Sequence, residues 1–204
     1  PILQTERDSI ISYIKENNLQ KPVIMGHSLG AFMAFWIASA EPDLCSKIIC
    51  VDGLPFISAM QNENVTADSV KKDPRFNAEA MASYFLSLPD SNYEKNQAAS
   101  MLWQVSDSAR AKQIAHWSFL SDRRTLGYAY SEMSSTDLRQ EIAKIKCPVL
   151  MLGSIYYTKE NSEKIINAQL KNLSNKTIEI ADSKHFIMYD VPEWFYNKVD
   201  NFLR

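Results

Sequence analysis

Hydrophobic and polar residues follow one another in blocks that predict short buried strands separated by helices. Apolar residues recur at helical spacing over Thr5–Asn18, which predicts an amphipathic helix. Two short apolar runs, Lys21–Met25 and Lys47–Val51, predict buried strands, and the stretch Leu29–Ala40 between them is apolar almost all round, as in a buried helix. Continuous apolar strands joined through helices are typical of a parallel sheet that is covered on both faces.

The same rhythm returns near the C-terminus. Pro148–Leu152 and Thr177–Ile180 predict two more strands, each followed by a helical pattern, over Asn161–Leu173 and Trp194–Leu203. The order is therefore helix, strand, helix, strand, an intervening region, and then strand, helix, strand, helix. We predict an α/β fold with a mostly parallel sheet.

The intervening region has helical patterns and no convincing strand. Because it is too long for a plain connection, we interpret residues 55–139 as an all-helical insertion into a core made of residues 1–54 and 140–204. The clearest helical face in the insertion, with spacing i, i+3, i+4 and i+7, consists of Met81, Tyr84, Phe85 and Leu88.

Charge and cysteine content narrow the range of partners. The formal net charge is −2, which gives no bulk attraction to nucleic acid or to an anionic membrane. The longest apolar stretch, Ala31–Ala40, is about half of the roughly 20 residues that a membrane-spanning helix needs. The three cysteines do not fit a disulfide framework or the spacing of metal ligands, so we expect buried thiols and favour a reducing compartment such as the cytoplasm.

The start of the chain suggests a larger protein. Pro1 rather than Met comes first, and it leads directly into a helical pattern. A sheet that began at Lys21–Met25 would expose an apolar strand at its edge, which soluble proteins avoid. We therefore expect that this edge is paired with segments outside the present sequence.

The segment Gly26-His27-Ser28-Leu29-Gly30 fits the nucleophile elbow, Gly-x-Ser-x-Gly between a strand and a helix. A random chain of this length contains that pattern only roughly one time in fifteen, before the strand and the helix are required. The motif predicts a strained Ser28 that acts as nucleophile, with Gly26 and Gly30 required because a Cβ there would collide. The N–H of Leu29, at the helix start, is predicted to stabilise an oxyanion.

The position of the catalytic base follows from chain order. In this kind of site the acid and then the histidine follow the serine along the chain. Of the three histidines only His185, in the loop after the last predicted strand, meets that order. His27 lies next to Ser28, but adjacent side chains on such a turn point apart, so we expect it to pack or to line the pocket.

The acid has two candidates. The loop after the third predicted strand, Gly153–Thr158, contains no carboxylate. Glu160 is the nearest, but it falls in the first turn of a helix, where acidic residues are common for dipole reasons alone. Asp52 directly follows the strand next to the nucleophile strand, so we predict that Asp52, and not Glu160, hydrogen-bonds His185.

Four segments together resemble the α/β-hydrolase-fold hydrolases that carry helical lids, over essentially the whole chain: Gly26–Gly30, Val51–Phe56, Thr136–Arg139 and His185–Met188. The resemblance implies an eight-stranded sheet, of which this chain would supply strands five to eight and the lid. The loop that holds the second oxyanion donor would then lie outside the sequence. Some members carry their acid after strand six, which corresponds to Asp52.

These observations predict a serine hydrolase that cleaves a carboxylic ester or similar acyl bond of a small molecule through an acyl-enzyme, without metal or cofactor. An apolar lid favours an apolar acyl or aryl group, and its candidate lining residues are Met81, Phe85, Trp103 and Trp117. Other activities on the same fold stay open: an aminopeptidase of the proline-iminopeptidase type, a C–C bond hydrolase, a cofactor-free haloperoxidase, or a ligand-binding homologue without catalysis. The sequence leaves the oligomeric state open.

Overall fold

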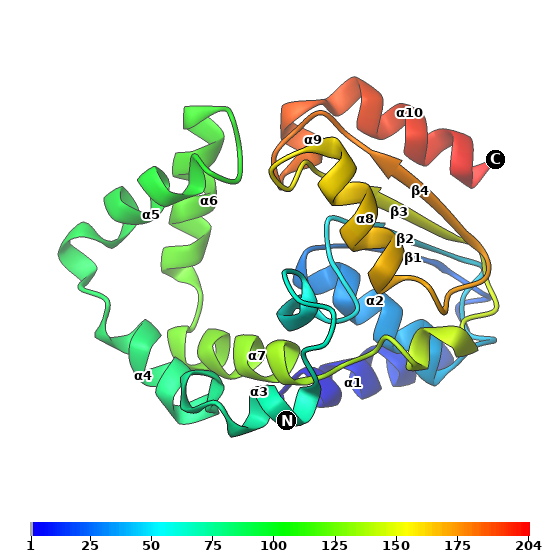
Figure 1. Ribbon diagram of the computed structural model, residues 1–204, viewed down its shortest axis with the longest axis horizontal. Helices are drawn as coiled ribbons and strands as arrows, with labels where there is room; N and C mark the ends of the chain where they lie inside the picture. Colours follow the sequence, from blue (N-terminus) through cyan, green and yellow to red (C-terminus); the bar gives the residue numbers. More distant parts are fainter. Residues whose placement is uncertain (1) are drawn as a thin grey trace.

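The computed structural model describes residues 2–204, and its central feature is a parallel sheet of four strands (Figure 1). The strands lie side by side in chain order: β1 (Val23–His27), β2 (Lys47–Val51), β3 (Val149–Gly153) and β4 (Lys176–Ile180). All three neighbouring pairs are parallel. The predicted α/β fold with a parallel sheet is confirmed. Strand β1 begins and ends two residues later than predicted, because its pairing with β2 continues through Gly26 and His27 into the elbow.

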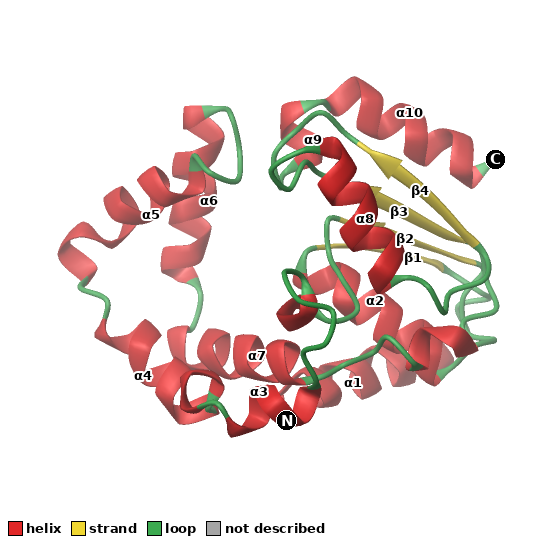
Figure 2. Cartoon of the chain, viewed as in Figure 1, coloured by secondary structure: helices red, strands yellow, loops and turns green. Residues whose placement is uncertain are grey.

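Helices cover both faces of this sheet, as Figure 2 shows. In β2, Ile48 and Cys50 belong to the larger core cluster, together with residues of α1 (Ile2–Glu16), α2 (Leu29–Ala40) and α8 (Lys159–Gln169). The alternate residues Ile49 and Val51 belong to a second cluster with α9 (Ile187–Asp190) and α10 (Pro192–Leu203). Successive side chains of a strand point to opposite faces, so the two clusters make a three-layer fold.

The helix boundaries differ from the predicted ones by a few residues. Helix α1 lies two to three residues earlier than predicted. Helix α8 also ends earlier than predicted, and it begins earlier because the Thr158 side chain caps it by accepting from Asn161 N. Pro192 starts α10 two residues early, as proline readily occupies the first helical turn. The short helix α9 was not predicted, since four residues are too few to show a period.

The insertion between β2 and β3 is helical. It contains α3 (Ala67–Lys72), α4 (Ala78–Ser87), α5 (Tyr93–Met101), α6 (Ser108–Leu120) and α7 (Arg123–Ser135), with single 3₁₀ turns between some of them. Four of these helices begin at polar caps, since a side chain accepts a hydrogen bond from a first-turn N–H at Thr66, Asn77, Asp107 and Asp122. Helices α5 and α6 form an arm that stands apart from the sheet in Figure 1.

The last helix of the insertion packs against the core. A Cβ at Gly127 of α7 would lie 2.5 Å from the Cα of Ala82, so this glycine allows α4 to approach closely. Glu132 of α7 accepts hydrogen bonds from the backbone N–H groups of Leu3 and Gln4, each at 2.9 Å. The carboxylate therefore caps the start of α1, where unpaired N–H groups favour a negative charge.

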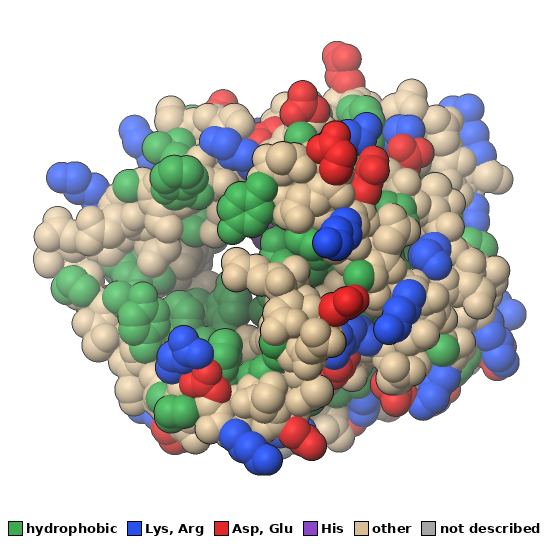
Figure 3. All heavy atoms as spheres, in the orientation of Figure 1, with side chains coloured by type: hydrophobic (Ala, Val, Ile, Leu, Met, Phe, Trp, Pro, Cys, Tyr) green, Lys and Arg blue, Asp and Glu red, His purple; other side chains and the backbone are tan. Residues whose placement is uncertain are grey.

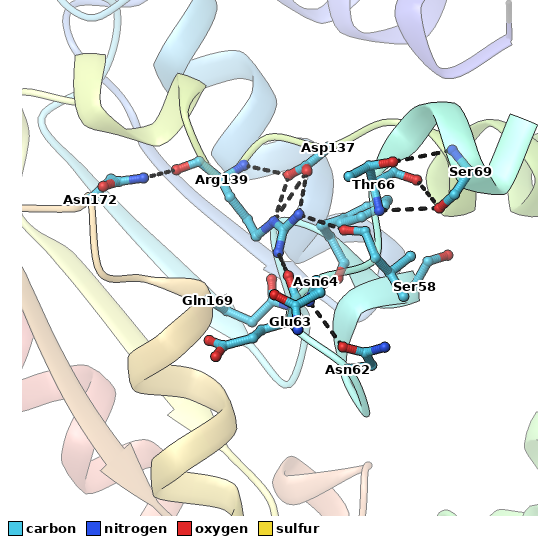
Figure 4. A network of polar contacts seen from close by, with 12 residues as sticks. Ser58, Asn62, Glu63, Asn64, Thr66, Ser69, Asp137, Arg139, Gln169 and Asn172 are labelled. Atoms are coloured by element: carbon cyan, nitrogen blue, oxygen red, sulfur yellow. Dashed lines mark hydrogen bonds and ion pairs between the residues drawn. The ribbon is translucent and has the colours of Figure 1, made fainter.

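Arg139 ties together the two ends of the insertion (Figure 4). Its guanidinium is paired with Asp137, which holds it in place, and donates to the carbonyl oxygens of Glu63 and Val65 at 2.7 and 2.8 Å. It also lies 4.9 Å from the centre of the Phe56 ring. The first and last segments of the insertion therefore lie side by side.

Strand β1 forms one edge of the sheet. Two of its apolar side chains, Val23 and Met25, are 43% and 55% exposed, whereas every residue of β3 is buried. The three cysteines are buried free thiols, and the Sγ atoms of Cys45 and Cys147 lie 3.7 Å apart. None of the described helices is both long enough and apolar enough to cross a membrane.

Candidate active site

Ser28 stands at the sharp turn between β1 and α2. Its φ of 56° and ψ of −116° are strained for a residue with a side chain. The turn is held on both sides, because Ser28 N donates to Val51 O at 2.8 Å and Ser28 O accepts from Ala31 N at 3.0 Å. A Cβ at Gly26 would lie 2.0 Å from Gly30 O, so strand and helix meet where only glycine fits.

The expectation for the second glycine of the motif is wrong. A Cβ at Gly30 would have no heavy atom within 4 Å, so the close approach uses its backbone and does not require a missing side chain. A different glycine is tightly confined. A Cβ at Gly53 would lie 2.3 Å from Ser28 O, so the chain after β2 passes directly against the elbow. The pair Asp52-Gly53 was visible in the sequence, but only as a turn signal.

Asp52 and His185 are joined by a hydrogen bond, 2.6 Å between Oδ2 and Nδ1. Asp52 follows β2 in a left-handed conformation, with φ 46°, and its side chain is 1% exposed. Aspartate tolerates this conformation better than most residues. His185, 26% exposed at its side chain, lies in the turn after β4. The contact is the one predicted from the sequence.

Three further donors surround the Asp52 carboxylate. Oδ1 accepts from Ser154 N at 2.8 Å and from the hydroxyl of Tyr156 at 2.6 Å, and Oδ2 accepts from Ser154 Oγ at 2.8 Å. Both residues belong to the loop after β3, which contains no carboxylate of its own. That loop supplies hydrogen-bond donors to an acid on the neighbouring strand, a role that the sequence analysis missed.

These contacts decide the charge of Asp52. Burial alone would raise the pKa of this carboxyl, but the hydrogen bonds from His185, Tyr156 and Ser154 outweigh burial and hold the pKa below its ordinary value. Burial, and then the nearby charge of Asp52, raise the pKa of Tyr156 well above its usual range, so the phenol stays a donor. An ionised Asp52 fixes the proton of His185 on Nδ1 and leaves the Nε2 lone pair free to accept.

Glu160, the alternative acid, occupies another place. It is exposed in the first turn of α8, where the backbone N–H of Glu160 and the side chain of Thr158 lower its pKa. Nδ1 of His185 is already taken by Asp52. Glu160 therefore lies in a first helical turn, where the helix dipole alone explains an acidic residue.

His27 is hydrogen-bonded to the backbone of His185. Its Nε2–H donates to the carbonyl oxygen of His185 at 3.0 Å, and its ring lies 4.4 Å from the His185 ring and 4.7 Å from that of Phe186, between centroids. Burial chiefly, with a contribution from His185, lowers the pKa of His27 to about 4. Of the two roles expected for His27, packing and lining the pocket, the structure shows packing, with a neutral His27 under the turn that carries His185.

The N–H of Leu29, the expected oxyanion donor, lies at the start of α2. Leu29 is the first residue of α2, so its N–H has no intrahelical acceptor and lies one residue from Ser28. Within residues 2–204, no group of three or more His, Cys, Asp or Glu side chains could hold a metal ion.

The four predicted lining residues lie in the helical insertion. Met81 and Phe85 are half-buried on α4, and Phe85 stacks on Tyr130 of α7 with 5.7 Å between ring centroids. Trp103, between α5 and α6, is 86% exposed, and Trp117 on α6 is 47% exposed. Figure 3 shows a hollow between the insertion and the sheet layers, with hydrophobic side chains on the insertion side.

A cavity of about 1010 Å³ lies elsewhere. It opens between α8, the loop after the Ile57–Ala59 turn and the segment around Arg139, and none of the residues predicted for the site lines it. Its walls are mixed in character and include Met60, Asn62, Glu63, Lys164 and Ile165.

Comparisons with known proteins concern the family and the fold of the chain. The family model for the alpha/beta hydrolase fold matches residues 10–192. A serine hydrolase-like protein of Dictyostelium discoideum is 24% identical over 87% of this chain, which spans 56% of that relative's length.

Solved structures are similar at lower identity. A probable hydrolytic enzyme of Pseudomonas aeruginosa PAO1 has a TM-score of 0.74 at 13% identity, covering 99% of this chain and 69% of that one. A structure from work on carboxylesterases of Nitrososphaera gargenis has a TM-score of 0.70 at 15% identity, covering 98% of this chain and 71% of that one. At such identities the likeness concerns the fold alone. With its elbow, its parallel sheet and a family match over most of its length, the chain belongs to the alpha/beta hydrolase fold family.

Proposed function

We propose that this protein is a serine hydrolase that cleaves a carboxylic ester, or a related acyl bond, of a small and largely apolar molecule. One observation carries the proposal: the buried carboxylate of Asp52 is hydrogen-bonded at 2.6 Å to Nδ1 of His185, whose backbone carbonyl binds His27, the neighbour of the strained Ser28. A structural ion pair would explain the first contact. It would not explain the strained serine between a strand and a buried helix.

In the proposed reaction, Ser28 Oγ attacks the substrate carbonyl carbon while Nε2 of His185 takes the hydroxyl proton. Asp52 stays ionised and stabilises the imidazolium. The N–H of Leu29 donates to the developing oxyanion. The imidazolium then protonates the leaving alcohol, and water, activated by the same histidine, releases the acid from the acyl-enzyme and restores Ser28. Every step uses only water, side chains and one backbone N–H group.

We further propose that β1–β4 correspond to strands five to eight of the family's sheet, and that the sheet continues past β1. The exposed apolar side chains Val23 and Met25 support this, because an unpaired apolar edge invites pairing with another strand.

Residues 55–139 are proposed to be a lid over Ser28. The insertion is helical, and apolar side chains face the hollow in Figure 3. We propose that Met81, Phe85, Trp103 and Trp117 contribute to the acyl pocket, and the exposure of the two tryptophans leaves their faces free for a substrate.

A fluorophosphonate probe on the full-length protein tests the proposed nucleophile. We expect covalent labelling on the peptide that contains Ser28, identified by mass spectrometry, and turnover of p-nitrophenyl esters that rises with acyl length while the apolar pocket is being filled. Ser28→Ala should abolish both. Turnover at the native rate by Ser28→Ala would refute the assignment, and a protein that neither labels nor hydrolyses any ester would refute the proposed function.

A further inference from the structure

The turn that carries His185 is fastened to the insertion as well as to the core. We use "the His185 turn" for residues 183–190 and "the α5–α6 loop" for residues 102–107. Phe186 N donates to Gln104 O at 2.9 Å, and the ammonium group of Lys184 donates to Leu102 O at 2.6 Å. The partners are about 80 residues apart in sequence, so this is tertiary contact between two loops.

Asp190 is the centre of this junction. Its Oδ1 accepts from Ser106 N at 2.8 Å, and its Oδ2 accepts from Ser106 Oγ at 3.1 Å and from Lys184 N at 3.0 Å. One carboxylate thus binds the α5–α6 loop through two donors and closes the His185 turn on itself through a third. Hydrogen bonds to an ionised acceptor are the stronger kind.

Apolar packing supports the same junction. Phe186 and Tyr189 pack against a small buried cluster of Val105, Ala111 and Ile114 from the α5–α6 loop and α6. The guanidinium of Arg110 lies 4.5 Å from the centre of the Tyr189 ring. Both faces of the His185 turn therefore have partners, with His27 and Asp52 on the core side and the insertion on the other.

We infer that Asp190 is a positioning residue: its carboxylate fixes the His185 turn against the α5–α6 loop and so sets the direction in which Nε2 of His185 points. The inference rests on the proposed function for its consequence in catalysis, though not for its structural test. It follows that the insertion helps to align the base, in addition to any part in covering a substrate. A displacement near 1 Å of a catalytic group costs on the order of 10²-fold in rate.

The test compares Asp190→Asn with Asp182→Asn, the same chemical change at an exposed position of the loop before His185. An amide at 190 replaces one carboxylate oxygen with an NH2 group, which then faces the backbone N–H of either Ser106 or Lys184. We expect kcat for ester turnover to fall on the order of 10²-fold with KM unchanged. The low-field proton resonance of His185 Nδ1–H, which reports the bond to Asp52, should broaden or move. Asp182→Asn should leave all three quantities as in the native protein.

A merely structural Asp190 would give a different result. Asp190→Asn would then unfold at a lower temperature, while the folded enzyme kept native kcat and an unchanged resonance, and the inference would be overturned. Should that variant not fold, Ser106→Ala removes only the hydroxyl donor and should shift the resonance in the same direction with a smaller loss of kcat; an unchanged resonance there also overturns it. The resonance needs no substrate, so a protein without esterase activity would refute the proposed function and still decide the role of Asp190.

Discussion

The neutral His27 beneath the His185 turn makes the stability of the fold depend on pH. The pKa of His27 is lowered to about 4, against 6.5 for an unperturbed histidine. Between these values the unfolded chain takes up a proton that the folded protein excludes. The free energy of unfolding must therefore fall as pH falls, with the full contribution present above pH 6.5 and lost by pH 4.

The size of the effect follows from the gap between the two pKa values. At 1.36 kcal/mol per pH unit, it amounts to roughly 3 kcal/mol, a large part of the stability of an ordinary domain. His185 and Asp52 are the titratable groups that face His27. The lowered pKa of Asp52 acts below 3.8, outside this window.

The perturbation is His27→Gln, which keeps an N–H donor for the carbonyl oxygen of His185 but does not titrate. Urea unfolding from about pH 7.5 to about pH 4.5 should show the native protein losing some 2–3 kcal/mol more than the variant. An NMR titration of the native protein should give a His27 midpoint near 4. Parallel stability curves for the two proteins, or a midpoint near 6.5, would refute the reasoning.

Three other predictions concern the site and the elbow. Asp52→Asn should lower kcat for esters roughly 10⁴-fold, by analogy with the serine protease acid, whereas Glu160→Gln should keep nearly all of it; the reverse order in a kinetic assay would exchange their roles. Tyr156→Phe removes one of four donors to Asp52, so urea unfolding should show a loss of about 2 kcal/mol while most of kcat remains, and an unchanged stability would contradict the contact. Gly26→Ala should cost at least about 3 kcal/mol, if the protein folds at all, while Gly30→Ala should be neutral or stabilising by up to about 1 kcal/mol in the same measurement.

The parts that depend on local pattern were predictable from the sequence. Strand β2 and helix α2 have the predicted bounds, because apolar runs with clear ends leave little choice of boundary. The pairing of Asp52 with His185 was also predictable, since parallel strands end at the same edge of a sheet and only one histidine had the right chain order.

Contacts between distant side chains were not predictable. Nothing local marks Tyr156 as a donor to Asp52, 104 residues away, or Asp190 as an acceptor for Ser106. The room beside Gly30 depends on what packs around α2, which a motif does not encode. The lining roles of the insertion's aromatic residues stay predictions for the same reason.

The bond between Glu132 and the start of α1 has a consequence for folding. The two backbone donors that it caps belong to the first turn of the chain's first helix, and the acceptor comes from the last helix of the insertion. Such a link joins early and late segments into one cooperative unit, so α1 and α7 should gain protection from hydrogen exchange together. A shortened protein that lacked the whole insertion would also lose the cap of a core helix, and it would exchange fastest at Leu3 and Gln4.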